Sequence, residues 1–120
     1  MCRIRNYLLV IIVLTASLFA TNLHAQKSKS KKEKLTEKRL REAEFFFTEG
    51  EKYYILEDFA KALVLFQKSL EINDQNATVH YKIAQILSRG SGLQKALESA
   101  RKAITLDSNN KYFYILKADI

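Results

Sequence analysis

The chain has 120 residues with no proline and three glycines, which is room for one small domain and favours an all-helical fold. Its single cysteine, Cys2, excludes an intramolecular disulfide, and with only His24 and His80 available we expect no metal and no cofactor. The net charge of +7 is concentrated in residues 27–41, with eight Lys or Arg against two Glu, whereas residues 42–120 are near neutral, so we expect no nucleic-acid partner.

Residues 1–25 have the features of a secretory signal peptide. A basic start at Arg3 and Arg5 precedes an uninterrupted apolar run, Tyr7–Ala20. Leu23-His24-Ala25 then ends in a small residue suited to cleavage. We therefore expect an exported protein of the periplasm or cell envelope of a Gram-negative bacterium. The alternative is an inner-membrane tether made by an uncleaved helix, for which the run is short, because spanning helices need about 20 apolar residues.

Residues 26–42 form a basic tether. The Lys- and Ser-rich stretch Gln26–Lys32 is predicted to be disordered, whereas good helix formers from Glu33 onward predict a helix that runs into the next segment. A solvated tether is the main interpretation. The alternative is contact of Lys27 to Arg41 with an anionic membrane or cell-wall surface, where each clustered Lys gains about 1 kcal/mol.

Residues 43–76 form a pair of amphipathic helices. The periodicity predicts a first helix over about Ala43–Leu56 and a second over about Phe59–Ile72. Glu57-Asp58 makes the turn between them, and the Asp58 carboxylate is expected to cap the second helix.

Residues 77–110 repeat this pattern without any gap. The segment FAKAL, which begins at Phe59, returns as LQKAL from Leu93, and KSLEIN, which begins at Lys68, returns as KAITLD from Lys102. The offset between the two members is the same for both pairs. Gly90-Ser91-Gly92 is expected to form the turn here, with a glycine in the left-handed region. Residues 111–120 open a third unit as the first helix of an incomplete repeat.

The helix–turn–helix period, about 34 residues long, resembles that of the tetratricopeptide repeat family, in the exported bacterial type. The family alternates large, small and aromatic residues on the first helix and small, aromatic and small residues on the second. The matching residues, which we expect to pack within and between repeats, are Phe46, Gly50, Tyr53, Ala62 and Phe66 in the first repeat and Ala84, Leu87, Ala96, Ala100 and Ala103 in the second. Ser69 and His80 complete the pattern, and the family's proline is missing, with Asp74 and Ser108 in its place.

The resemblance implies an all-α fold, a short α-solenoid of antiparallel helix pairs made of two repeats plus the first helix of a third. About three repeats are usually needed for stability. We therefore expect either a truncated form of a longer protein or an uncapped C-terminal end that a partner or self-association covers.

In this family a peptide or helix binds in the concave groove lined by the first helix of each repeat. The implied groove residues are Glu44, Phe47, Glu51, Tyr54, Thr78, Tyr81, Gln85, Ser88, Tyr112 and Ile115. Four aromatic residues would form a strip along it, although Phe47 and Tyr81 are equally suited to packing between repeats. Glu44 and Glu51 make the start of the groove acidic, which would suit a basic or neutral peptide. The family's carboxylate clamp for chaperones is absent, because only Lys82 is basic among the clamp positions.

The residues assemble no catalytic site. His80 occupies a packing position, Cys2 lies in the leader, and Gly90-Ser91-Gly92 lacks the Lys of a phosphate-binding loop. We expect an exported adaptor or scaffold that binds an unidentified protein or peptide, not an enzyme. One alternative is the docking or sensing module of a larger envelope protein with an anchoring, signalling or enzymatic domain. A weaker one is a membrane-tethered protein whose basic segment binds anionic surfaces.

Overall fold

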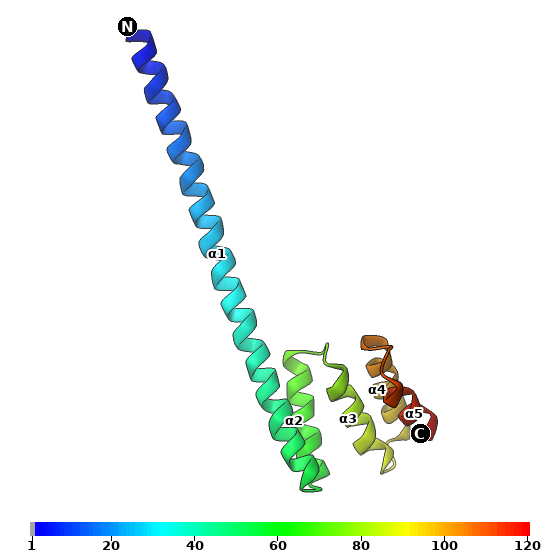
Figure 1. Cartoon of the computed structure of the whole chain (residues 1–120). Coiled ribbons are helices and arrows are strands. Elements are labelled where there is room, and N and C mark those ends of the chain that lie inside the picture. The colour runs from blue at the N-terminus through cyan, green and yellow to red at the C-terminus, as the bar shows by residue number, and fades with distance from the viewer. Residues whose placement is uncertain (1) are drawn as a thin grey trace. The chain divides into compact units, whose positions relative to one another are not determined.

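The structure is a computed structural model that describes residues 2–120, apart from the side chains of Leu23 and His24. The described chain is all helical, which confirms the expected all-α solenoid. In chain order the elements are α1 (Cys2–Ile55), α2 (Phe59–Ile72), α3 (Ala77–Ser88), α4 (Leu93–Leu106) and α5 (Lys111–Asp119) (Figure 1). The chain divides into two compact units, of which one ends at Glu37 and the other spans Lys38–Ile120.

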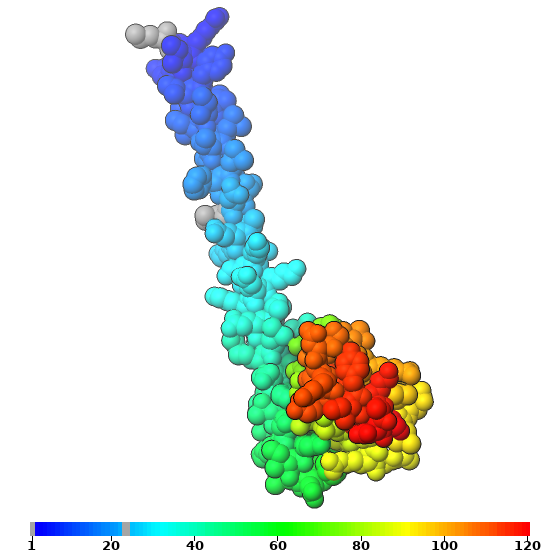
Figure 2. Space-filling view, turned by 45° about the vertical axis from the view of Figure 1, so that its right-hand side comes forward, coloured from blue at the N-terminus to red at the C-terminus, as the bar shows by residue number. Residues whose placement is uncertain are grey.

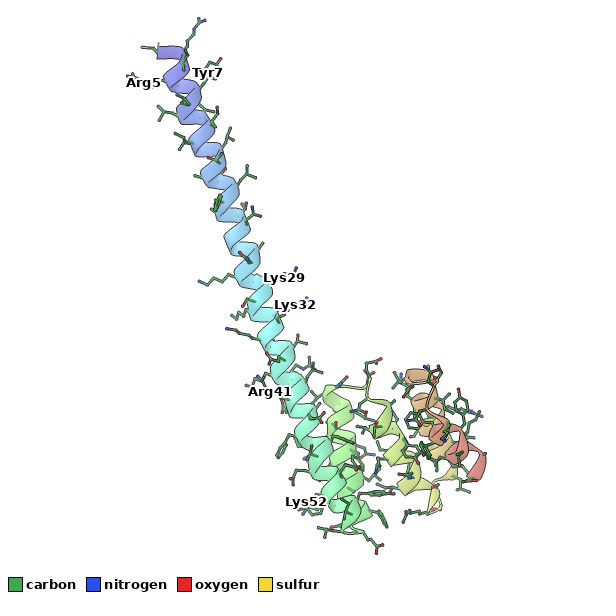
Figure 3. All side chains as sticks on the ribbon, in the orientation of Figure 1. Arg5, Tyr7, Lys29, Lys32, Arg41 and Lys52 are labelled. Carbon is green, nitrogen blue, oxygen red and sulfur yellow. The ribbon has the colours of Figure 1, made fainter. Side chains whose placement is uncertain are left out.

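The first unit consists of the N-terminal part of α1. Its described side chains are exposed, and Figure 3 shows Arg5, Tyr7, Lys29 and Lys32 projecting from the helix into solvent. An 18-residue window of α1 with a mean hydropathy of 2.0 is long and apolar enough to cross a membrane, a test that an N-terminal signal sequence also passes. The predicted cleavage motif includes Leu23 and His24, whose side chains lie outside the described residues.

The predicted disorder of Gln26–Lys32 is wrong, because this segment is helical and continuous with the rest of α1. The segment contains neither Gly nor Pro, and Lys is a good helix former. Helix on both sides also means that each residue only extends an existing helix, which avoids the cost of nucleation. The prediction that the helix runs on into the first repeat is confirmed.

Two matched linkers hold the repeats in register. Asn73 and Asp107, which occupy equivalent positions in the two repeats, each accept a hydrogen bond from the backbone N–H two residues later, at 3.2 Å in both linkers. Asn76 and Asn110 then cap α3 and α5 through their side-chain oxygens, which accept bonds from Thr78 N and Tyr112 N at 3.1 Å. These Asx turns and caps fix the linker conformation where the family has a proline.

The turn between α1 and α2 contains the left-handed residue that we predicted for the other turn. Glu57 has φ 60°, and no described glycine has a positive φ. The backbone N–H of Glu57 donates to Tyr54 O at 3.1 Å, and that of Asp58 donates to Tyr53 O at 3.0 Å, which is a Schellman motif. Asp58 caps α2 as expected, since its carboxylate accepts a bond from Lys61 N at 3.2 Å.

The predicted glycine conformation at Gly90-Ser91-Gly92 is therefore wrong. The end of α3 tightens instead, because Arg89 N donates to Ile86 O at 3.2 Å and Gly90 N to Leu87 O at 3.3 Å. These i→i+3 bonds satisfy the terminal carbonyls without a left-handed residue. Gly92 lies close to Leu87, since a Cβ there would be 3.3 Å from Leu87 Cδ2.

The core of the second unit is built around Phe66 of α2, which is 0% exposed. The Phe66 ring covers Gly50 of α1, whose absent Cβ leaves room for it, and lies 6.0 Å from the Phe47 ring. Val79 and Ile83 of α3 belong to the same buried cluster, so the first repeat is joined to the second there. Buried Ser69 adds a hydrogen bond across the helix pair by donating to Ala43 O at 2.8 Å.

The second repeat packs through smaller side chains. Ala96, Ala100 and Ala103 of α4 are 0% exposed, and Ala100 stands where the first repeat has Phe66. Alanine lets α4 approach α3 closely. α5 continues the stack through buried Phe113, whose ring lies 5.0 Å from that of Tyr81, and Figure 2 shows α5 in red against the orange end of α4.

Gly50→Ala is expected to lower the free energy of unfolding by roughly 1–3 kcal/mol, because the new Cβ would lie 2.6 Å from Phe66 Cε1. The gain in helix propensity, about 1 kcal/mol, offsets part of this overpacking. Urea unfolding of the full chain in a mild detergent, followed by near-UV circular dichroism, measures the change. Gly90→Ala is the control, since nothing lies within 4 Å of a Cβ there. Equal stability of the two variants would contradict the close contact.

Glu57→Gly is expected to raise the free energy of unfolding by about 0.5–1 kcal/mol, because glycine adopts a positive φ without steric cost. The same unfolding experiment reports it. Ser91→Gly in the other turn relieves no left-handed residue. That variant should leave the stability unchanged or lower it, and a similar gain from both would show that the turn conformation is not the cause.

Candidate functional site

Tyr54 of α1 lies at the centre of a polar and aromatic cluster that joins the first two repeats. Its hydroxyl donates to Gln85 Oε1 of α3 at 3.3 Å, and Gln85 Nε2 donates to the hydroxyl of Tyr81 at 3.0 Å. The Tyr54 ring also packs edge-on against Phe59 of α2, with 5.6 Å between the ring centroids. Three of the predicted groove residues are thus brought together.

Glu51 and Lys82 form an ion pair beside Tyr54. Lys82 Nζ lies 3.2 Å from Glu51 Oε1, and the two side chains are 20% and 30% exposed. The same ammonium group lies 4.4 Å from the centroid of the Tyr54 ring. The pair compensates the Glu51 charge, so the expected acidic character of the groove is reduced to that of exposed Glu44.

Arg89, the C-cap residue of α3, borders this cluster and was not predicted. Its guanidinium carbon lies 4.7 Å from the centroid of the Phe59 ring and 5.9 Å from that of Tyr54. Its Nη2 atom donates to the Tyr54 hydroxyl over 3.5 Å. The sequence signal was weak, because a basic residue at a helix C-terminus is common for electrostatic reasons alone.

Tyr81 occupies the middle of the aromatic strip between Tyr54 and Tyr112. Partial burial raises the pKa of the Tyr81 phenol, and the phenols of Tyr54 and Tyr112 raise it further. Gln85 links Tyr54 to Tyr81, and Tyr81 lies against Phe113, the chain neighbour of Tyr112, so the three tyrosines lie near one another. Tyr81 packs on Phe113, while Tyr112 is 59% exposed, so the two differ in how much ring they offer to a partner.

The remaining predicted groove residues have different surroundings. Phe47 is half-buried and packs against the core beside Phe66, as its packing alternative predicts. Ser88 is part-buried and donates to Gln85 O at 3.0 Å. The exposed members of the set are Glu44, Thr78, Tyr112 and Ile115.

The predicted packing residues are buried or part-buried, as expected. Gly50, Ala62, Phe66, Ala84, Ala96, Ala100 and Ala103 are buried, and Phe46, Tyr53 and Leu87 are part-buried. The six-position pattern missed Val79, Ile83 and Ile86, which bury the face of α3 toward the first repeat. Their i, i+4, i+7 spacing was the signal that could have identified them.

His80 has a structural role at the start of α3. Its Nε2 lies 3.0 Å from Asp74 O, six residues earlier, and the hydroxyl of Tyr114 donates to Ser108 O at 3.1 Å over the same separation. The expected core position is taken instead by neighbouring Val79, which is 0% exposed. His80 and Tyr114 therefore fasten each linker to the helix that follows it.

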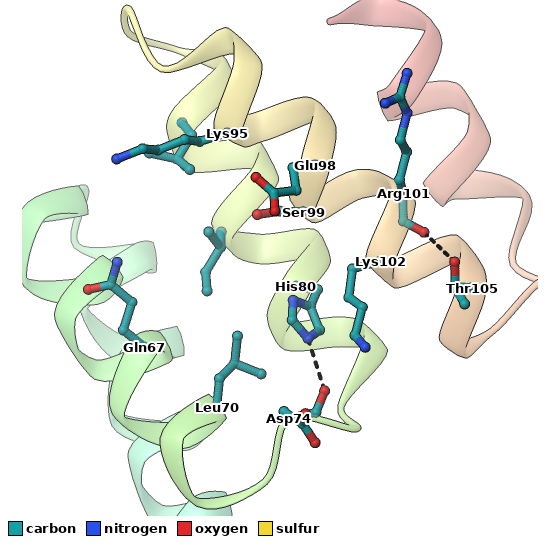
Figure 4. Close-up of a pocket in the computed structure, with 12 residues that line it drawn as sticks. Gln67, Leu70, Asp74, His80, Lys95, Glu98, Ser99, Arg101, Lys102 and Thr105 are labelled. Atoms are coloured by element: carbon teal, nitrogen blue, oxygen red, sulfur yellow. Dashed lines mark hydrogen bonds between the residues drawn. The ribbon is translucent and has the colours of Figure 1, made fainter.

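A cavity of about 630 Å³ lies beside His80, between α2 and α4 (Figure 4). Leu70, Ile83 and Leu87 give it an apolar floor. Lys95 and Lys102 lie on either side of Glu98 along α4, while Arg101 points away from the other labelled side chains (Figure 4). Since these charges alternate, the cavity favours neither an anion nor a cation. None of the predicted groove residues lines it.

Within the described part of the chain, no group of three or more His, Cys, Asp and Glu residues could hold a metal ion. The residues clustered around Tyr54 provide aromatic faces, an amide, phenols and a guanidinium, which are groups suited to noncovalent contact.

Tyr81→Phe is expected to make stability less sensitive to alkaline pH. A phenol with a raised pKa in the folded state stabilises the fold fully below the ordinary value of 10.0. That contribution is lost as the pH rises through the folded-state pKa, because the unfolded chain ionises more readily. Urea unfolding at pH 8 to about pH 11 should show a shallower loss for the variant. Tyr7→Phe, at a residue that is 70% exposed, is the control and should follow the wild type.

Comparisons with known proteins support the fold. No family model and no curated protein matches the chain. Among solved structures 48 chains match, and one of these is the crystal structure of MamA, a helical repeat protein similar to tetratricopeptide repeat proteins. The match has a TM-score of 0.60 and 20% sequence identity, and it covers 62% of this chain and 44% of the MamA chain. At this identity the likeness shows a helical-repeat fold.

Proposed function

We propose that this protein is an interaction module that binds a peptide or protein segment across α1, α3 and α5. The observation that carries the proposal is the cluster around Tyr54. Tyr54, Gln85 and Tyr81 are hydrogen-bonded across two repeats, so their side chains are fixed before a partner arrives. Rigid aromatic residues lose little conformational entropy on binding, which favours affinity.

The exposed aromatic and aliphatic side chains of α5 extend this surface. Tyr112 is 59% exposed and Ile115 is 53% exposed. An aromatic ring can bury a large area, and its phenol tolerates one wet face. A segment laid across the helices could therefore contact Tyr54, Tyr81 and Tyr112 in turn, with the apolar part of the contact on α5.

We further propose that the protein is exported and acts in the cell envelope. The supporting features are the basic start, the apolar run Tyr7–Ala20 and the small residue Ala25. N-terminal sequencing of the exported protein should begin at Gln26. A chain that retains Arg3 and Arg5 would instead favour a membrane tether, with Lys27 to Arg41 close to the lipid surface.

The double variant Tyr54→Ala with Tyr112→Ala should recover at least about tenfold less of its partner in a pull-down from an envelope fraction. Two aromatic hot spots of about 1–2 kcal/mol each would more than account for such a loss. Quantitative mass spectrometry of captured proteins measures it, with far-UV circular dichroism to confirm that helicity is kept.

Phe45→Ala is the matched control, because Phe45 is also an aromatic residue of α1 and is 60% exposed, but lies outside the proposed surface. It should recover the partner as the wild type does. If the double variant and the control capture the same proteins in the same amounts, the surface is wrongly assigned.

A further inference from the structure

We propose that Arg89 is an anion-binding side chain that selects partners with an aspartate or glutamate in the bound segment. This inference rests on the proposed function, since it names the chemical class of the segment that binds beside Tyr54. It replaces the expectation of a basic or neutral peptide, which rested on Glu44 and Glu51.

The guanidinium of Arg89 is held in place on one side only. It stacks over Phe59 at 4.7 Å, and one of its N–H groups is used by the Tyr54 hydroxyl at 3.5 Å. A guanidinium has five N–H donors in a planar fork, so several of them face solvent here. Stacking on an aromatic ring restricts the fork, which lowers the entropy lost when a ligand is bound.

The positive charge of Arg89 has no carboxylate partner in the described structure, whereas the positive charge of nearby Lys82 is paired. Lys82 also lies over the Tyr54 ring, but Glu51 compensates its charge at 3.2 Å. Among the residues that the structure describes, no carboxylate forms an ion pair with Arg89. This part of the surface therefore keeps one positive charge that a partner can neutralise.

Glu44, the acidic residue at the start of the groove, lies too far from Tyr54 to neutralise the positive charge there. Glu44 precedes Tyr54 by ten residues on the same helix, which is about 15 Å along the axis at roughly 1.5 Å per residue. This distance exceeds the Debye length of about 8 Å at physiological salt, so the charge of Glu44 is largely screened from a group that binds beside Tyr54. Glu44 therefore does not oppose a partner carboxylate that binds near Tyr54.

The geometry favours a carboxylate over other groups. A planar guanidinium fork matches the two oxygens of a carboxylate, which accept parallel N–H bonds. The hydroxyl of Tyr54 and the amide oxygen of Gln85 are already bonded to each other, and Arg89 is the cation here that no described carboxylate pairs with. An acidic side chain next to an apolar one would pair with Arg89 while its neighbour packs on the aromatic rings.

The test is selection from a random nonapeptide phage-display library against the full chain held in nanodiscs of zwitterionic lipid, after depletion on empty nanodiscs. The wild type should enrich aspartate or glutamate at one position by roughly fivefold over the input library, the size expected for a partly exposed ion pair. Arg89→Gln should still enrich peptides, but without the acidic position.

Lys117→Gln is the control, because it removes one exposed positive charge from α5, outside the cluster. It should keep the acidic preference. Enriched peptides without an acidic position, or an acidic preference that survives Arg89→Gln, would overturn the role of Arg89 and leave the proposed function standing. A library that yields no enriched peptide, with the Tyr54→Ala and Tyr112→Ala variant behaving as the wild type, would overturn both.

Discussion

The contact between Gly50 and the ring of Phe66 is the constraint on which the folded unit depends. A glycine on α1 allows the ring of α2 to lie where a Cβ would stand 2.6 Å from it. Once seated, the ring becomes part of the surface on which Val79 and Ile83 of α3 pack. One side chain thus closes the first repeat and provides the platform for the second, which explains why neither helix pair could bury its apolar face alone.

Much of this arrangement could be predicted from the repeat alone. The bounds of α2 follow from Asp58 as its cap and from the polar residues after Ile72, because both signals are local. The left-handed residue could not be located in the same way. α1 and α2 are separated by so few residues that the chain must reverse within Leu56-Glu57-Asp58, whereas Arg89–Gly92 gives the other turn more length. The demand for a positive φ therefore follows from loop length and not from where glycine stands.

The repeat pattern predicts which residues of the candidate site share a surface, but not the side-chain contacts between them. The repeat pattern placed Tyr54, Tyr81 and Gln85 on one surface because their positions are fixed by helical periodicity. It could not predict that Glu51 would be compensated by Lys82, or that Arg89 would stack on Phe59 of another helix. Those contacts join side chains of different repeats, and they depend on rotamers that only the packed structure decides. As a result the charge preference that we propose for the surface is the opposite of the one its sequence suggested.

The first and last helices of the folded unit, α1 and α5, differ in the polarity of the side chains that they expose. The α3 residues Ile83 and Ile86, which pack on the first repeat, correspond to Glu49 and Lys52 in α1, and these form an ion pair at 3.6 Å. Burying that pair under another repeat would cost the desolvation of both charges, so α1 presents the polar outer face of a terminal repeat. α5 instead exposes Tyr112 and Ile115, whose apolar atoms gain free energy when they are covered. Covering α5 therefore costs less desolvation of charge than covering the Glu49–Lys52 pair, and the charge that we propose to orient a bound segment lies with Arg89 at the end of α3.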